Sequence, residues 1–447
     1  MKKFSVILGV SFLFFIAFLL FSGLKQAKKP NVLIVLIDTL RADHLGYMGY
    51  ERDTSPFIDS FAASNLVFKY GKSTSAWTPP SIASLFSGMY ASVHGHMPLR
   101  SQTEYGKRFT KLDNSFVTLA EVFKENGYAT AAISANPLVG ERYGLSQGFD
   151  LFVSPGRERA EKVNWRARKY ISEMWDRQKP LFLYLHYMEP HDPYEPPAPY
   201  DSMFSGELKS RSYPQEQSNL INLYDGEIRY VDSKIEKIFA WLKEQGLYED
   251  MIILLVSDHG EQFMERGYQG HADRTYSEEI HIPFILKARS LQGIEETPVS
   301  LVDAYPTLLD LAGISVEHKI HGYSLVSAIQ KRKKEGIYSE IIRHVNEKSY
   351  LRWDGYKLIN EYIMQRGVVL TPDLLTADPE MISSQVFNIF NDPFEINPIK
   401  DEQLHAELSR SFLDLYAEHL GHKGDYKTSE IELDDKALEQ LKTLGYL

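Results

Sequence analysis

The chain has 447 residues, of which 43% are hydrophobic and 24% are charged, and its formal net charge is −11. A chain of this length can bury one large core or two domains. Its negative charge argues against a nucleic-acid-binding surface. There are no cysteines, which excludes disulfides, thiolate metal sites and a cysteine nucleophile.

The N-terminus carries a membrane signal. Lys2 and Lys3 precede Phe4–Leu24, an almost unbroken apolar run long enough to span a bilayer as a helix. No clean small-x-small cleavage site follows it. We therefore predict that residues 1–29 form a membrane anchor and a short linker, with the catalytic body outside the cytoplasm, in the periplasm or at the cell surface. The alternative is a cleaved signal peptide and a secreted or periplasmic protein.

After the linker, strand-like and helix-like segments alternate. The apolar runs are continuous, as expected for strands buried on both faces of a parallel sheet. This alternation predicts an α/β fold, with a large, mainly parallel sheet and helices on both faces, over residues 30–335. The predicted strands are Asn31–Asp38, Tyr128–Ala135, Leu181–His186, Met251–Ser257 and Pro283–Leu286, and the predicted helices include Val117–Asn126, Leu223–Gln245 and Leu301–Ala312.

The pattern changes beyond about Glu335. Ser349–Ile359 contains two strand-like runs joined by Asp354-Gly355, which is a strong hairpin signal. A helical tail follows and ends at Leu447. We predict that residues 336–447 form a small C-terminal α+β subdomain with a hairpin and a terminal helix.

The central stretch of the chain surrounds Thr78. Prolines follow this residue and Gly88 lies ten positions further on, which predicts a short helix from about Pro80 to Ser87. Thr78, just ahead of it, would face the free N–H groups and the positive end of the helix dipole. The Thr78 hydroxyl is therefore either a simple helix cap or a nucleophile that meets an anion.

Chemically useful side chains follow two of the apolar strands. Asp38 ends the first strand, and Asp258 and His259 end the strand Met251–Ser257. Ligands of open α/β sheets bind at the carboxyl ends of strands, so these side chains can converge with Thr78. Their mixture of oxygen and nitrogen atoms favours one divalent cation, zinc or manganese, although calcium or magnesium remains possible.

Several motifs resemble those of the sulfatase family of the alkaline phosphatase superfamily. The family signature Cys/Ser-x-Pro-Ser-Arg falls, with slight slippage further on, on the segment that begins at Thr78. The resemblance extends from about Pro30 to the last residue and implies an alkaline phosphatase-like fold. The other matching segments are Pro30–Asp38, Pro190–Tyr194, Ser257–Glu261, Val302–Gly313 and the terminal Leu-Gly-Tyr.

The resemblance also implies roles for individual residues. Asp38, Thr78, Asp258 and His259 would hold the metal, and Thr78 would also attack the substrate. His191 and His271 would contact the transferred group or protonate the leaving oxygen. Asn136 would bind the same substrate oxygens as His191.

The departures from the family pattern favour its Thr-nucleophile relatives, which resemble phosphoglycerol and phosphoethanolamine transferases and phosphoesterases. Thr78 cannot mature to formylglycine as Cys or Ser does, because its β-carbon carries a methyl group, and Ile82 replaces the usual Arg. We therefore predict a metal-dependent hydrolase or transferase that acts on anionic phosphate esters without formylglycine. The alternatives are a sulfatase acting on sulfated glycans or aryl sulfates, and a non-catalytic binder of anionic glycans.

Overall fold

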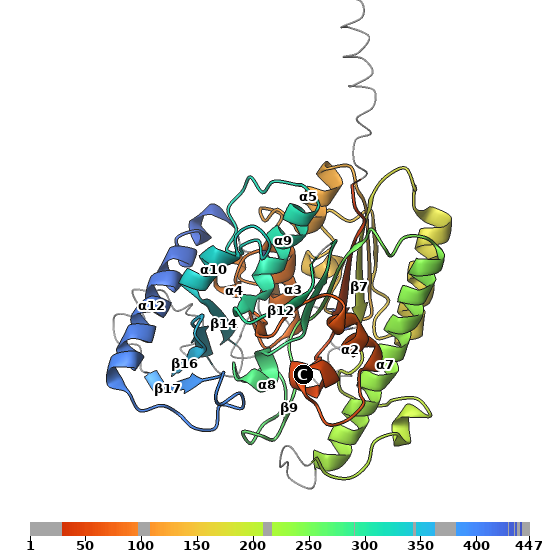
Figure 1. Cartoon of the computed structure of the whole chain (residues 1–447). Helices are drawn as coiled ribbons and strands as arrows, with labels where there is room; N and C mark the ends of the chain where they lie inside the picture. The colour runs from red at the N-terminus through yellow and green to blue at the C-terminus, as the bar shows by residue number, and fades with distance from the viewer. Residues whose placement is uncertain are drawn as a thin grey trace, which may run out of the picture.

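The computed structural model describes residues 29–96, 108–208, 217–289, 291–342, 346–362, 381–427 and 429–432, together with positions 434, 435 and 439. Within them, a large sheet forms the centre of the molecule and a smaller sheet lies to one side (Figure 1).

The large sheet has eight strands in the order β12-β2-β11-β8-β1-β7-β5-β6. Its central strand β1 pairs in parallel with β7 on one side and with β8 on the other. Strands β5 and β6 extend the parallel part beyond β7, whereas β11 runs antiparallel to β8. The strands are β1 (Val32–Ile37), β2 (Leu66–Phe68), β5 (Ala129–Ser134), β6 (Leu151–Val153), β7 (Leu181–Tyr187), β8 (Ile252–Ser257), β11 (Phe284–Lys287) and β12 (Gly293–Glu295).

Continuous apolar sequence explains the position of the central strands. All residues of β1, β5, β7 and β8 are buried, because helices cover both faces of the sheet and leave neither side to water. The predicted α/β class, with a large, mainly parallel sheet, is confirmed. The short strands β2, β6 and β12 were not predicted, because segments of three residues carry little periodicity.

The helices form two layers (Figure 1). One face of the sheet is covered by α2 (Pro56–Ala63), α6 (Ala160–Lys169) and α7 (Ser218–Glu244). The other face is covered by α3 (Thr78–Ser87), α5 (Leu119–Glu125) and α9 (Ala304–Leu311). Helix α3 begins at Thr78 rather than near Pro80, so Thr78 is its first residue and not the residue before it.

Short elements complete the main body. Helices α4 (Ala91–His94), α8 (Ser277–Ile280) and α10 (Ile329–Glu335) connect larger elements. Three two-stranded pairs are β3 (Gly71–Lys72) with β13 (Val299–Ser300), β9 (Gln262–Phe263) with β10 (Gln269–Gly270), and β4 (Arg108–Lys111) with β18 (Ser429–Glu432).

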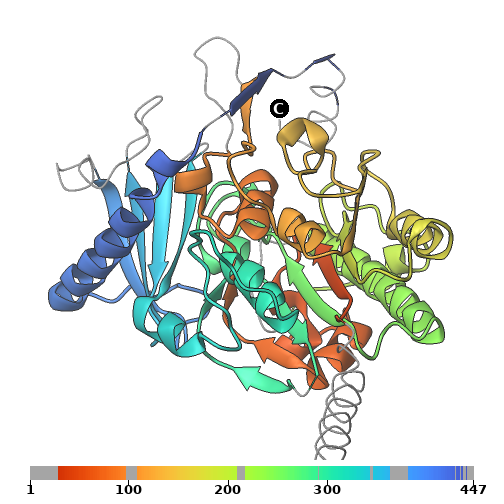
Figure 2. The same ribbon diagram turned by 90° about the horizontal axis from the view of Figure 1, so that it is seen from above.

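The smaller sheet is antiparallel, with the order β14-β15-β16-β17, and α12 (Glu402–Leu420) lies beside it (Figures 1 and 2). Its strands are β14 (Ile337–Ile342), β15 (Asn346–Leu351), β16 (Tyr356–Tyr362) and β17 (Met381–Asn388). Asp354-Gly355 joins β15 to β16 with Gly355 at φ 86°, so the hairpin is present. The domain boundary at residue 335 stays a prediction, and the tail Leu438–Leu447 lies outside the described residues apart from position 439.

The membrane anchor requires a correction. Among the described residues, no helix combines the length and the apolar character that crossing a bilayer demands. Phe4–Leu24, the stretch behind the expected anchor, lies outside the described residues. The residues that the structure describes thus give no support for the expected anchor.

Gly88 ends α3 and offers a test of how that helix is held. It has φ 69°, and an added Cβ would lie 3.1 Å from Ile320 Cγ2 and 3.2 Å from Tyr305 Cγ. Gly127 has a similar φ of 84° with nothing within 4 Å. Gly127→Ala should therefore cost only backbone strain, about 1 kcal/mol of unfolding free energy. Gly88→Ala should cost about 1 kcal/mol more, because overpacking adds to the strain.

Urea unfolding of both variants measures the difference. Equal losses of stability in the two variants would contradict the tight packing of Gly88 against Ile320 and Tyr305.

Candidate active site

The site lies at the carboxyl ends of adjacent parallel strands. Asp38 follows β1 and Asp258 follows β8, and the register places Ile37 of β1 beside Ser257 of β8. His186 lies in β7, beside Leu36 of β1. The pairing of these strands therefore brings two carboxylates and an imidazole to one edge of the sheet.

The side chains of Asp38, His186 and Asp258 form a compact buried group. One ligand atom from each lies within 4.8 Å of the other two. Asp258 Oδ1 accepts hydrogen bonds from the backbone N–H groups of Thr39 and His259, at 3.2 and 3.0 Å. Asp258 Oδ2 and Asp38 Oδ1 have no hydrogen-bond partner among the described residues. Buried oxygens without donors are costly, so this pair fits a bound cation.

His259 adds a nitrogen lone pair beside these two oxygens of Asp38 and Asp258. Its Nδ1 lies 2.9 Å from the Gly260 carbonyl oxygen, which can only accept, so we assign the proton of the neutral ring to Nδ1. Nε2 then carries a lone pair, 3.5 Å from Asp258 Oδ2 and 3.8 Å from Asp38 Oδ1. Thr78 Oγ1 lies 3.1 Å from the same Nε2. The structure thus brings together all four predicted metal ligands.

The charges of the two aspartates also indicate a bound cation. Burial raises the pKa of Asp258, and the negative charge of Asp38 raises it further. Burial also opposes ionisation of Asp38, but the hydrogen bond from His186 and the nearby imidazoles hold the pKa of Asp38 below its ordinary value. Two buried carboxylates this close repel each other unless a proton or a cation lies between them. A divalent cation therefore fits the donors present.

Asn136 follows β5 and contacts a proposed ligand. Its Nδ2 donates to Asp38 Oδ2 at 2.6 Å, and its Oδ1 accepts from Leu138 N at 2.8 Å. His186 Nε2 lies 2.9 Å from the same Asp38 oxygen. Asn136 therefore orients the Asp38 carboxylate, and its predicted contact with substrate stays a prediction.

Three imidazoles lie together beside Thr78. The ring of His271 lies 4.5 Å from that of His259 and 5.0 Å from that of His191, between ring centres. Burial lowers the pKa of His191 to about 4, which favours its neutral form. His271 Nδ1 lies 3.0 Å from Glu261 Oε1. The predicted catalytic residues Thr78, His191 and His271 therefore share one site, although their roles remain predictions.

His186 and Glu261 were missed as site residues. His186 lies inside an apolar strand, where a buried histidine is usually structural. Its position at the strand's carboxyl end was the available signal. Glu261 belongs to the segment Ser257–Glu261, and its burial against His271 depends on a loop that sequence patterns do not place.

The smaller sheet holds the loop that carries His271. Glu347 of β15 accepts from the backbone N–H and the hydroxyl of Thr275, at 2.5 and 2.8 Å. Lys357 of β16 donates to the Thr275 carbonyl at 2.7 Å. Glu395, after β17, accepts from Ser277 N at 2.8 Å. The backbone just after His271 is therefore fixed from outside the main sheet.

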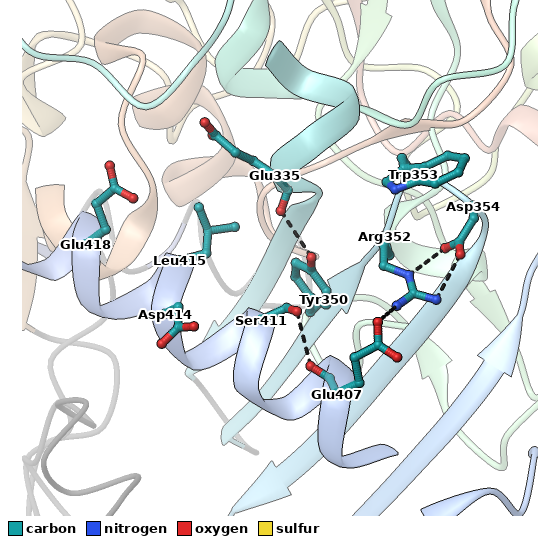
Figure 3. A pocket seen from close by; sticks show the side chains of 10 residues that line it. All are labelled: Glu335, Tyr350, Arg352, Trp353, Asp354, Glu407, Ser411, Asp414, Leu415 and Glu418. Carbon is teal, nitrogen blue, oxygen red and sulfur yellow. Dashed lines mark hydrogen bonds and ion pairs between the residues drawn. The ribbon is translucent and has the colours of Figure 1, made fainter. Parts of the chain in front are cut away.

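A separate groove of about 590 Å³ lies between α12 and the β15–β16 hairpin (Figure 3). Among the described residues that line it, Arg352 is the only cation, and it already pairs with Asp354 and Glu407. An anionic ester would be repelled there, so we place no substrate in the groove. The acidic lining residues are Glu335, Asp354, Glu407, Asp414 and Glu418.

The large sheet and the buried donors at its edge are those expected of an alkaline phosphatase-like fold. The sequence profile of the sulfatase family matches residues 30–314. The chain belongs to the sulfatase family, as its motifs predicted.

Curated relatives and solved structures agree with this family. Arylsulfatase K of Bos taurus is 25% identical over 440 residues, covering 79% of this chain and 78% of that protein. An arylsulfatase of Clostridium perfringens is 23% identical over 468 residues, and the match covers 86% of this chain and 92% of that protein. A 2-O GAG sulfatase superposes with a TM-score of 0.68 at 18% identity, covering 92% and 96% of the two chains. The phosphonate monoester hydrolase of Agrobacterium radiobacter superposes with a TM-score of 0.66 at 16% sequence identity, and the match covers 91% of this chain and 100% of that one.

The comparisons overturn the predicted preference for phosphate. The curated relatives described above are arylsulfatases, so the prediction of a Thr-dependent phosphoesterase or phosphotransferase is wrong. Its alternative, a sulfuric ester hydrolase, is the function that the relatives support. The prediction of phosphate was inferred mainly from Thr78. The identity of this residue limits which group can attack, but it does not determine whether that group attacks phosphorus or sulfur.

Metal analysis tests the ligand set. Asp38→Ala, Asp258→Ala and His259→Ala should each lower bound metal and activity in parallel, because loss of one ligand weakens the entire site. His44→Ala is a matched control, since His44 also forms a buried pair with an aspartate, 2.9 Å from Asp225 Oδ1. It should keep its metal. Full metal occupancy in Asp258→Ala, measured by elemental analysis, would exclude this ligand set.

Proposed function

We propose that the protein hydrolyses sulfuric esters, on sulfated glycans or aryl sulfates. The observation that carries the proposal is the convergence of the unpartnered oxygens of Asp38 and Asp258 with His259 Nε2 beside Thr78. Membership of the sulfatase family supports it. The arylsulfatase relatives support the choice of sulfate.

The chain's own groups suit a sulfate ester. Thr78 is the first residue of α3, a helix of ten residues, so the free N–H groups and the helix dipole favour an anion beside it. Asp38, Asp258 and His259 would hold the divalent cation, with Thr78 or His186 as a further ligand. When bound, that cation would polarise the oxygens of the sulfate group. Asn136 keeps the Asp38 carboxylate in place.

The histidines can supply the proton that the leaving alcohol needs. Hydrolysis of a sulfate ester breaks a bond to the alcohol oxygen, which needs a proton as it departs. His271 is our candidate proton carrier, because Glu261 lies 3.0 Å from its Nδ1 and stabilises the protonated ring. His191 would contact the sulfate group or the departing oxygen through Nε2 after this nitrogen takes up a proton, because the Asp192 carbonyl holds the first proton of the ring on Nδ1. Thr78 Oγ1, which lies beside the metal ligands, would attack the sulfur as the bond from sulfur to the alcohol oxygen breaks. Water would then attack the same sulfur and release inorganic sulfate and free Thr78.

The donor types also guide the choice of metal. Two carboxylates, one or two imidazoles and a hydroxyl favour zinc or manganese. Calcium or magnesium would prefer oxygen ligands alone. Metal identity is therefore part of the proposal and is decided by elemental analysis of protein purified without added metal.

A paired assay tests the choice of sulfate. Metal-loaded protein should hydrolyse 4-nitrophenyl sulfate with a higher kcat/KM than 4-nitrophenyl phosphate or its matched diester. A chelator should abolish turnover of the sulfate, and the removed metal should restore it. Sulfated disaccharides, followed by release of inorganic sulfate, test the glycan substrates. A higher kcat/KM on either phosphate ester would contradict the proposal.

Substitution at position 78 tests the residue placed at the sulfur. Thr78→Ala should lower kcat on the sulfate ester by about 100-fold or more, as expected when a reacting group is removed. Thr78→Ser keeps the hydroxyl and should retain measurable turnover. Ser81→Ala is the control, because Ser81 lies one turn further along α3 with its hydroxyl on the Ser75 carbonyl, at 2.9 Å.

Two results would argue against this role for Thr78. One is a Thr78→Ala variant with a near wild-type rate. The other is a modified residue 78, detected by mass spectrometry of the peptide that spans it, because the proposal requires unmodified threonine at this position.

A further inference from the structure

Arg157 holds the loop that carries His191. This arginine lies between β6 and α6, and its guanidinium donates to the carbonyl oxygens of three consecutive loop residues. Nη2 lies 2.9 Å from the oxygen of His191 and 2.8 Å from that of Pro193. Nη1 lies 2.6 Å from the oxygen of Asp192. One rigid, planar group thus fixes the backbone on both sides of Asp192.

The composition of the loop explains why it needs an outside donor. Pro190 and Pro193 have no backbone N–H, so the segment Pro190–Tyr194 has few donors for its own carbonyls. The His191 N–H is already bonded to the Met188 carbonyl, at 2.9 Å. The bond to the His191 carbonyl is partly buried, where a carbonyl needs a donor, whereas the bonds to the Asp192 and Pro193 carbonyls are exposed. The guanidinium provides the donors in a fixed planar arrangement that a lysine ammonium cannot reproduce.

The Asp192 carbonyl connects Arg157 to the His191 ring. His191 Nδ1 lies 2.6 Å from this oxygen, which is the same oxygen that accepts from Arg157 Nη1. A carbonyl oxygen can only accept, so Nδ1 carries the proton of the neutral ring and Nε2 carries the lone pair. Both the orientation of the ring and its tautomer therefore depend on where Arg157 holds this carbonyl.

We propose that Arg157 is a positioning residue, which sets the orientation and the tautomer of His191 for the reaction. This inference rests on the proposed function, because that proposal places His191 at the sulfate group. Arg157 itself contacts only the backbone of the loop in these three bonds. Its effect on the reaction passes through His191.

The neighbouring Arg159 provides a matched control. It carries the same charge and lines the same cavity of about 210 Å³ as Arg157. Among the described residues, its guanidinium makes one hydrogen bond, from Nη2 to the Glu195 carbonyl at 3.1 Å, beyond the His191 loop. Charge and local solvation are therefore similar in the two positions, and only Arg157 reaches the carbonyls around His191.

Steady-state kinetics on 4-nitrophenyl sulfate test the proposal. Arg157→Ala should lower kcat by about 10- to 100-fold, the scale expected from displacing a reacting group by about 1 Å, with KM changed by about twofold or less. Arg157→Lys should recover only part of the loss. Arg159→Ala should keep its kcat within about twofold, and all variants should keep their bound metal.

Chemical rescue with added guanidinium is a second test. The cavity beside Arg157 leaves room for a small cation, so millimolar guanidinium should restore part of the kcat of Arg157→Ala and none of that of His191→Ala. Arg157→Ala with kcat near the wild-type value, beside a strongly impaired His191→Ala, would overturn the proposal.

A measurement without turnover separates this inference from the proposed function. Nitrogen-15 NMR of labelled histidine reports which ring nitrogen is protonated, and the His191 signal is assigned by its absence in His191→Ala. In the full-length protein that signal should show protonated Nδ1, and Arg157→Ala should shift it towards a mixture of tautomers. An unchanged His191 signal in Arg157→Ala would overturn the positioning role. Failure of all variants, wild type included, to hydrolyse sulfate would overturn the proposed function, while the NMR comparison would still decide the role of Arg157.

Discussion

The site depends on two buried carboxylates of like charge. Asp38 and Asp258 follow neighbouring strands, and each keeps one oxygen for which the described part of the chain supplies no donor. Their repulsion must be balanced by a proton or a cation. The surrounding residues satisfy the other oxygens: Asn136 and His186 bond Asp38, and backbone N–H groups bond Asp258. One oxygen of each carboxylate is thus hydrogen-bonded by the protein, and the other oxygen is left for a ligand.

Sequence patterns predicted the parts of this arrangement that depend on strand order. A continuous apolar run followed by Asp38, and another followed by Asp258 and His259, place those side chains at one sheet edge, as the structure has them. His186 escaped prediction because a histidine inside an apolar strand is usually structural, and its position near the carboxyl end of β7 was the only signal of another role. The contact of Glu261 with His271 escaped it as well, because a loop with no periodicity brings them together.

The choice between phosphorus and sulfur could not be made from individual residues. Thr78 and Ile82 depart from the family pattern, and both changes bear on how a nucleophile is generated. Ile82 is fully buried in the main core, so its side chain serves packing. Neither residue reports on the charge or the alcohol of the substrate. The proposal of a sulfate ester therefore rests on the similarity to arylsulfatases over most of the chain.

The contacts from Glu347, Lys357 and Glu395 to the loop after His271 have a consequence for how the chain can be divided. The family match ends at residue 314, and every proposed metal ligand lies before that point. A fragment cut there would keep the cation's ligands but lose the anchors of the loop next to His271. Metal binding and proton transfer thus draw on different lengths of the chain, and changes in the smaller sheet can alter the second without touching the first.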